Sequence, residues 1–270
     1  MKGNSLQTNS GLMQHSKKHR QPWAGAVAIL PGMGAFKGES GDNHEHHHWA
    51  HQLSIGLKQP VRIMTGKDTL EAKALFVRAG TPHRLLSGSV LSCYFDPTSS
   101  EAKAIHAMLY DTRIIAEPPA ELVGKVLQAF DEAGSIDKGL VLLRGCLHAK
   151  SDCRDNRKLL EIVLKAVRGS LESQQMLTRG NLADLVGLSE SRFSHWFREQ
   201  TGMPLRSYRK WLRLIGGIEQ VLAGRTLADA AYAAGFADQA HFTRTFVQMF
   251  GVKPSDVFAQ ITLGVHRCRG

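Results

Sequence analysis

The hydrophobic positions of the chain follow two different patterns, which change near Pro97. Before Pro97, short apolar runs are broken by glycine and proline, as in β-strands joined by turns. The runs that we interpret as strands are 24–30, 52–57, 61–64, 74–77, 84–86 and 90–95. Several short strands in series predict a small antiparallel barrel or sandwich.

Helical spacing begins after Pro97. Apolar residues recur every three or four positions in 119–133 and 136–147, which predicts a helical hairpin. Its apolar stripes are able to pack on the barrel, on each other or on a second copy of the chain as a dimer seam, and the pattern leaves all three open. The polar stretch 149–156 predicts a linker, and the chain then looks helical to about residue 262. The prediction is an α+β fold.

Residues 181–201 predict a helix-turn-helix unit, which is two helices joined by a tight turn. A short helix ends at a turn containing Gly187, and Ser189 is placed to cap the next helix over 190–201. Phe193, Trp196 and Phe197 fall on its inner face. The polar face, which we expect to contact DNA, carries Ser191, Arg192, Ser194, His195 and Arg198.

A second unit of the same kind follows. Thr226 is placed to cap a helix over 227–234, Gly235 supplies the turn, and Asp238 is placed to cap a helix over 239–250. Phe242, Phe246, Met249 and Phe250 point inward. The residues left for the DNA groove are Gln239, Ala240, His241, Thr243 and Arg244.

The segment 204–223 links the two units with helical periodicity. As a helix of ~20 residues it spans ~30 Å, close to the ~34–36 Å of one turn of DNA. One chain therefore has the reach to place two helices in successive major-groove segments. A basic face for phosphate contact is expected from Arg206, Arg209, Lys210 and Arg213.

Residues 157–258 resemble the DNA-binding domain of the AraC/XylS family of bacterial regulators. The resemblance rests on 182–189, on Trp196-Phe-Arg198 with 201–204, and above all on 230–236 with 242–246 and 250–254. It implies promoter DNA as partner, a homodimer, a small-molecule effector and, for an activator, RNA polymerase. The chain departs from the family pattern at His195, where arginine is common, and at Gly216 and Gly217, each of which costs ~1 kcal/mol of helix propensity.

Five histidines crowd into residues 44–51, with Trp49 among them, and His83 follows later. The His46-x-His48 pair resembles the first motif of the cupin barrel, and His83 resembles the later cupin histidine. Metal-binding cupins carry glutamate where this chain has Gln52. Three interpretations stay open: an effector pocket, a metal site formed by His46, His48 and His83, or packing histidines. The residues assigned to the effector pocket are His46, His48, Trp49, His51, Gln52 and His83.

The resulting domain prediction has a flexible arm at 1–22, a cupin-like effector-binding and dimerisation domain at 23–150, and a DNA-binding domain at 151–270. The N-terminal domain is expected to be a small cupin-like barrel with the helical hairpin. The C-terminal domain is expected to be all-α, with two helix-turn-helix units joined by a linking helix.

Composition narrows the function classes. The 270-residue chain has a net charge of +10, which favours a polyanionic partner without identifying it. Its four cysteines form no C-x-x-C pair, and Cys93 is expected to be a free thiol rather than a redox sensor. No apolar stretch approaches the ~20 residues of a membrane span, and residues 1–21 lack a signal core, so we expect a cytoplasmic protein without a membrane partner.

No catalytic motif is found, so we expect no enzyme activity and no required cofactor. The main rival is a metal-dependent cupin enzyme fused to a helical domain. A basic protein that binds RNA or a membrane surface is a weaker alternative, because the chain has neither a stacking-aromatic sheet motif nor an amphipathic anchor.

Overall fold

The structure is a computed structural model that describes residues 21–109, 113–147, 156–173 and 175–263. The predicted arm at 1–22 and linker at 149–156 lie almost wholly outside these residues. A seven-stranded sheet has the order β10-β1-β2-β8-β3-β6-β9, and a smaller sheet has the order β5-β4-β7. The strands of the large sheet are β1 (Ala24–Leu30), β2 (Met33–Ser40), β3 (His51–Gly56), β6 (Ala74–Val77), β8 (Gly88–Phe95), β9 (Ile115–Ala116) and β10 (Ile261–Leu263); those of the small sheet are β4 (Val61–Thr65), β5 (Asp68–Ala72) and β7 (Arg84–Leu85).

Strands appear where apolar runs predicted them, and two longer ones were missed. In β2 (MGAFKGES) glycine interrupts the apolar residues and polar residues follow them, and three of the five residues of β5 (DTLEA) are polar. Neither strand contains more than two consecutive apolar residues other than glycine, so local hydrophobicity gave only a weak signal. The loop of Pro31 and Gly32 joins β1 to β2, with Leu30 paired to Met33 and Gly32 at φ +83°. Glycine adopts this left-handed conformation without steric cost.

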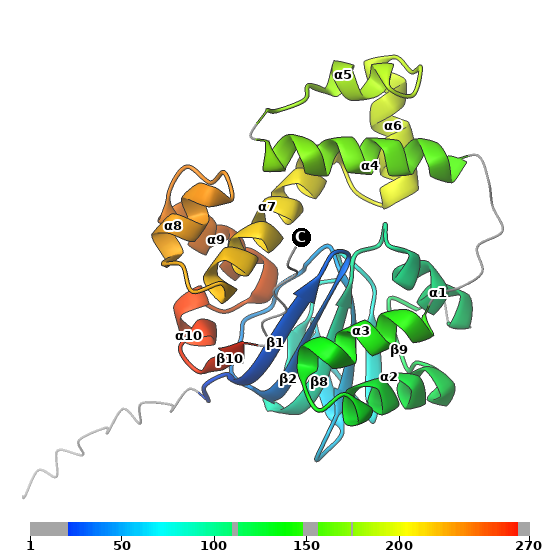
Figure 1. Cartoon of the computed structure of the whole chain (residues 1–270). Helices are drawn as coiled ribbons and strands as arrows, with labels where there is room; N and C mark the ends of the chain where they lie inside the picture. Colours follow the sequence, from blue (N-terminus) through cyan, green and yellow to red (C-terminus); the bar gives the residue numbers. More distant parts are fainter. Residues whose placement is uncertain (1–20, 110–112, 148–155, 174, 264–270) are drawn as a thin grey trace, which may run out of the picture.

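Helices cover one face of the large sheet. The hairpin consists of α2 (Ala120–Glu132) and α3 (Ile136–Cys146), of which α3 packs on β1 and β2, and α1 (Ser100–Met108) precedes it (Figure 1). Leu122, Val126, Leu140 and Leu143 are buried with the sheet residues Leu53 and Leu91 in one apolar core. The hairpin therefore packs on the barrel and its two helices pack on each other, which are the first two of the three arrangements left open. Val141 and Leu142 on α3 stay 44% and 42% exposed.

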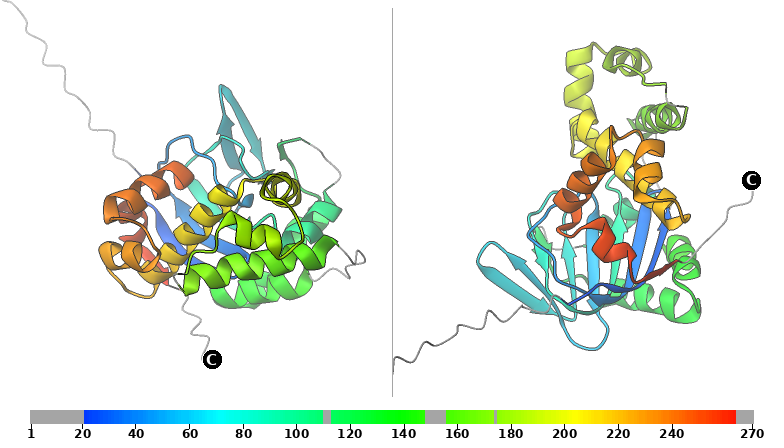
Figure 2. Two further views of the ribbon diagram at one scale, coloured as in Figure 1. Left: turned by 90° about the horizontal axis from the view of Figure 1, so that it is seen from above. Right: turned by 90° about the vertical axis from the view of Figure 1, so that its left-hand side faces the viewer.

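The C-terminal half consists of α4 (Asn156–Glu172), α5 (Arg179–Asp184), α6 (Glu190–Thr201), α7 (Leu205–Leu222), α8 (Leu227–Ala233), α9 (Gln239–Phe250) and α10 (Pro254–Phe258). The group α4 to α6 stands away from the sheets, whereas α8 to α10 lie beside the barrel (Figures 1 and 2). The helix α7 runs from one group to the other. No helix in the described parts of the chain has both the length and the apolar character required to cross a bilayer.

The second helix-turn-helix unit shares an apolar core with the barrel. Phe36 and Val90 from the large sheet, and Ile63 from the small one, are buried in the same cluster as Trp211 and Phe246. The first unit has a separate core, which includes Phe193, Phe197 and Tyr208. The described residues thus form three apolar cores, and the second of these joins strands of the N-terminal half to helices of the C-terminal half.

The chain ends its helical half with a strand. Ile261 to Leu263 form β10, which pairs in parallel with Gly25 to Val27 of β1. The prediction of helix to about residue 262 was therefore wrong at its last residues. The reason is physical: the hydrogen-bond partner of β10 lies more than two hundred positions earlier, where a local pattern carries no information about it.

The two glycines of α7 do not break the helix. Gly217 is buried, and a Cβ atom at this position would lie 2.5 Å from Cε2 of Phe242 in α9. Gly216, in contrast, has open space at the corresponding point. The departure from the family pattern at Gly217 is explained by the close approach of α9, which requires a residue without a side chain.

Candidate DNA interface and effector cavity

The first helix-turn-helix unit consists of α5 and α6. Thr178 caps α5 in a reciprocal capping box with Asn181, the turn contains Gly187 at φ +67°, and Ser189 caps α6 by accepting from the amide of Arg192. Phe193 and Phe197 are fully buried, and Trp196 is half-buried. The polar face is open: Ser191, Arg192, His195 and Arg198 are exposed and Ser194 is partly exposed.

The second unit consists of α8 and α9. Thr226 caps α8, Gly235 turns the chain at φ +74°, and Asp238 caps α9 by accepting from the amide of His241. The inward prediction is confirmed for Phe242, Phe246 and Met249, which are buried. On the other face, Gln239, Ala240, His241 and Arg244 are exposed, and Thr243 is partly exposed.

The connection α7 has 18 residues, so it spans about 27 Å. Its basic residues differ in accessibility. Arg206 is exposed, but Arg209 is half-buried and donates to the carbonyl oxygen of Leu177. Burial also lowers the pKa of Arg209. Lys210 donates to Oε1 of Gln248 on α9 at 3.0 Å. Arg209 and Lys210 therefore hold neighbouring segments in this conformation, and Arg206 is presented to solvent.

Three of the N-terminal histidines meet inside the barrel. The backbones of His46 and His83 exchange two hydrogen bonds of 2.9 Å, which brings the loop before β3 against the segment before β7. Ligand atoms of His46, His48 and His83 lie within 4.8 Å of one another, and all three residues are buried. Burial lowers the pKa of His46 to about 3 and also lowers those of His48 and His83, so the imidazoles are neutral at neutral pH.

Gln52 joins this cluster from β3. Its Oε1 lies 2.8 Å from Nε2 of His48 and 3.0 Å from Nε2 of His83. The amide nitrogen of Gln52 donates to Oγ of Ser54, which is hydrogen-bonded to Ser92 on the neighbouring strand. A polar network therefore runs from the histidines through the buried interior face of the sheet.

Two residues assigned to the same pocket lie elsewhere. His51 faces the opposite side of β3, because side chains alternate along a strand. Its Nε2 lies 3.0 Å from Nε2 of His106, and its ring stacks on Phe76. Trp49 is partly buried between the apolar core of the second unit and that of the first. Neither lines the cavity described next, and His48 and His83 do not line it either, so of the six residues assigned to the effector pocket only His46 and Gln52 are among its lining residues.

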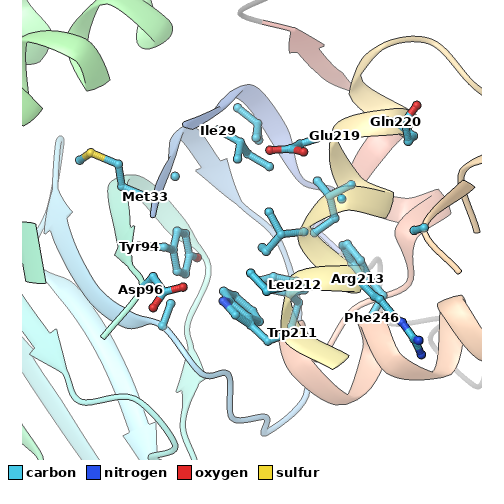
Figure 3. Close-up of a pocket in the computed structure, with 18 of the residues that line it drawn as sticks. Ile29, Met33, Tyr94, Asp96, Trp211, Leu212, Arg213, Glu219, Gln220 and Phe246 are labelled. Atoms are coloured by element: carbon cyan, nitrogen blue, oxygen red, sulfur yellow. The ribbon is translucent and has the colours of Figure 1, made fainter. Parts of the chain in front are cut away.

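A cavity of about 960 Å³ lies between the barrel and α7. Figure 3 shows Tyr94 and Asp96 of the barrel facing Trp211 and Leu212 of α7 across it. Most of its wall is apolar, with His46 and Gln52 at one part of the lining. Sequence reasoning missed the contribution of α7, whose apolar positions were interpreted only as a helix stripe. Further lining residues are Val27, Ile29, Phe36, Arg168, Ile215, Glu219 and Phe250.

The carboxyl group of Asp96 anchors one end of this wall. It accepts from the amide and hydroxyl of Thr98 at 2.8 and 2.6 Å. Burial raises its pKa, whereas the bonds from Thr98 and the charge of Arg168 act in the opposite direction. Arg168 on α4 in turn donates to the hydroxyl of Tyr208 on α7 at 3.3 Å. Charged and polar groups thus connect the barrel with the first helical unit.

Cys93 is buried in the sheet, and burial raises the pKa of its thiol, so the reactive thiolate is disfavoured. This environment agrees with a spectator thiol.

A small barrel followed by two helix-turn-helix units on one connecting helix defines a class of two-part DNA-binding protein. Residues 182–260 match a family model described as "Helix-turn-helix domain". The chain is 32% identical over 104 residues to the "Transposon Tn10 TetD protein" of Escherichia coli, covering 37% of this chain and 75% of that protein. It is 42% identical over 60 residues to the "HTH-type transcriptional activator RhaR" of Pectobacterium atrosepticum, covering 22% of this chain. The match spans about a fifth, 21%, of the length of RhaR.

Solved structures extend the likeness to the whole fold. The crystal structure of ToxT from Vibrio cholerae O395 superposes with a TM-score of 0.55 at 13% identity, covering 87% of this chain and all of that one. A structure described as unsaturated fatty acid bound wild-type ToxT gives a TM-score of 0.51 at 12% identity, covering 91% and 98%. The ToxT structures support the fold, and the 32% identity to TetD over 75% of that protein, together with the match to the helix-turn-helix family model, places the chain in the AraC/XylS family. That family comprises transcription regulators, not enzymes, and the rival enzyme hypothesis is therefore set aside.

Proposed function

We propose that this chain regulates transcription by binding promoter DNA with α6 and α9 together. The observation that carries the proposal is that α7, a continuous helix of about 27 Å, joins the two units whose second helices are α6 and α9. Both α6 and α9 have an exposed polar face. Contacts are assigned to Ser191, Arg192, Ser194, His195 and Arg198 in the first unit, to Arg206 on α7, and to Gln239, Ala240, His241, Thr243 and Arg244 in the second. Arg209 would join them only if its bond to Leu177 opened.

The test is selection of bound fragments from genomic DNA by the full chain, followed by titration of a selected site at several salt concentrations. We expect sequence-preferring binding whose affinity falls steeply with salt. Replacing Arg192 and Arg244 together by alanine should reduce affinity for the selected site. Lys67→Ala, which removes one exposed positive charge from the barrel, should have little effect. Equal losses in both variants, or no preferred sequence, would contradict the proposal.

The proposed control element is a small-molecule effector in the cavity between the barrel and α7. Its volume of about 960 Å³ falls within the range of ligand sites in proteins, and its wall combines apolar side chains with a few polar groups. Because α7 forms one wall and connects the recognition helices, an occupant would bias how they are held. The similar fold of ToxT, whose structure is described as unsaturated fatty acid bound, supports the proposal of a small-molecule effector.

The cavity is tested with a fluorescent apolar anion, 1-anilinonaphthalene-8-sulfonate. The native chain should enhance its fluorescence, and Ile215→Trp, which fills the cavity from α7, should weaken dye binding while circular dichroism stays unchanged. Unaltered dye binding in this variant would argue against the cavity. Homodimer formation and contact with RNA polymerase remain part of the proposal, and the exposed Val141 and Leu142 on α3 offer an apolar surface for the former.

A further inference from the structure

We propose that His46, His48 and His83, together with Gln52, bind a divalent transition-metal ion such as Zn²⁺, and that the ion fixes the loop on which the second helix-turn-helix unit rests. The inference goes beyond DNA binding and does not depend on the effector. It rests on the convergence of three buried histidines, whose ligand atoms lie within 4.8 Å of one another.

The proton on each ring is assigned by its backbone partner. Nδ1 of His46 lies 2.9 Å from the carbonyl oxygen of His44. Nδ1 of His48 and Nδ1 of His83 each lie 2.8 Å from the carbonyls of Ala50 and Thr81. A carbonyl oxygen only accepts, so Nδ1 must donate in all three rings. Burial disfavours a second proton, and each Nε2 is left with a free lone pair.

These bonds are the outer-shell contacts that orient histidine ligands in metal sites. The three rings are close enough to share one ion, with centroid separations of 4.6, 5.1 and 5.8 Å. Their ligand atoms are within 4.8 Å of one another. For Zn–N bonds of ~2.0–2.1 Å, two ligands on one ion are separated by ~3–4 Å, so only small adjustments are needed.

Gln52 adds an oxygen atom to the histidine cluster. With both Nε2 atoms unprotonated, His48 and His83 direct lone pairs at Oε1 of Gln52 over 2.8 and 3.0 Å. Two nitrogen acceptors and one oxygen acceptor then face one another without a proton between them in the protein interior. This arrangement is unfavourable unless a cation lies among them. Rotating the amide would place its NH₂ group there and remove the conflict without an ion. The two arrangements respond oppositely to a carboxylate at residue 52.

The donor set selects the class of ion. Imidazole suits Zn²⁺ and its first-row neighbours, whereas Ca²⁺ and Mg²⁺ require shells of oxygen. Because all four donors are neutral, the charge of the ion is not compensated by the protein. His46 and Gln52 also line the large cavity, so a remaining coordination position has access to a water molecule or an anionic group from that side.

The same loop forms the resting surface for the end of α9. The amide of His44 donates to the carbonyl of Gly251 at 2.8 Å. Gly251 lies so near the cluster that a Cβ atom there would be 2.8 Å from Nδ1 of His46. The ring of Phe250, the last residue of α9, is centred 6.2 Å from that of His48. An ion that holds His46 and His48 would therefore also hold the surface that receives α9.

The experiment is calorimetric titration of the full, chelator-stripped chain with ZnCl₂, with CaCl₂ as a control ion. We expect one Zn²⁺ per chain at the cluster and no Ca²⁺ binding. His83→Gln should weaken Zn²⁺ affinity by at least about 100-fold, more than loss of an outer-shell partner costs. His47→Ala, in the same loop but half-exposed and outside the cluster, should change it by less than about threefold.

Gln52→Glu keeps the test decisive if His83→Gln does not fold. A carboxylate should tighten Zn²⁺ binding by ~10-fold or more, because it adds the missing negative charge. Hydrogen exchange should slow at residues 44–52 and 250–252 when Zn²⁺ is added to the native chain. No Zn²⁺ binding by the native chain, equal losses in His47→Ala and His83→Gln, or no gain in Gln52→Glu would each overturn the site. Unchanged exchange at 250–252 would overturn its link to α9.

Discussion

The carbonyl oxygen of Gly251 accepts a hydrogen bond of 2.8 Å from the amide of His44, which joins the residue after the second recognition helix to a loop of the barrel. Gly251 has a φ of +68°, and a Cβ atom there would lie 2.2 Å from the carbonyl oxygen of His44. The bond and the close contact make this glycine the tightest point of the contact between barrel and helices that we describe.

The first prediction concerns Gly251 and a matched glycine. Gly202 ends α6 with φ +74° and the same capping bond that Gly251 makes, but a Cβ atom there meets nothing within 4 Å. Gly202→Ala should cost ~1–2 kcal/mol of unfolding free energy from its left-handed backbone alone. Gly251→Ala should cost ~1–3 kcal/mol more, because the barrel loop must move. Urea denaturation measures both, and equal costs would show that the loop yields freely.

The second prediction compares neighbouring glycines of α7. Gly216→Ala should stabilise the helix by up to ~1 kcal/mol, since alanine has the higher helix propensity and space is open. Gly217→Ala should instead destabilise the chain by ~1–3 kcal/mol, because the new methyl group meets the buried ring of Phe242. Thermal unfolding gives the sign of each change. A stabilised Gly217→Ala would mean that α9 is not packed as closely as described.

The third prediction separates two arginines of α7 by role. Arg206→Ala should weaken DNA binding and reduce the salt slope by about one, as expected when a single phosphate contact is lost. Arg209→Ala should chiefly lower the unfolding free energy, by ~1–2 kcal/mol, because its bond to Leu177 is lost. The two measurements are DNA titration and urea denaturation on each variant. If Arg209→Ala affected only DNA binding, its partly buried position would be irrelevant to its role.

The fourth prediction concerns opposite faces of α9. Arg244→Ala should cost ~1–3 kcal/mol of affinity for a preferred DNA site and leave the unfolding transition in place, because its side chain is exposed. Phe246→Ala should destabilise the chain by ~3–5 kcal/mol, because this ring is buried in the core shared with the barrel. Retained stability in Phe246→Ala, or unchanged affinity in Arg244→Ala, would mean that the faces are wrongly assigned.

The helix-turn-helix units could be predicted in detail because their signals are local. Ser189, Thr226 and Asp238 each cap the helix that they were expected to cap, and Gly187 and Gly235 adopt left-handed turns. Capping and turn formation involve residues only a few positions apart, so the order of residue types contains most of the information.

The histidine cluster could be predicted only in part. His46, His48 and Gln52 are near one another in sequence, and they meet as expected, but His51 falls on the opposite side of β3 beside His106. A count of nearby histidines does not reveal where the loop ends and the strand begins, and that boundary decides which face each ring takes.

The sequence by itself determined the two recognition helices, their caps and their polar faces, since these follow from helical periodicity and short-range hydrogen bonds. Only the tertiary structure decided that α7 forms a wall of the cavity, that Gly217 admits Phe242, and that β10 pairs with β1. Those relationships depend on which surfaces are buried together, and burial joins residues that are far apart along the chain.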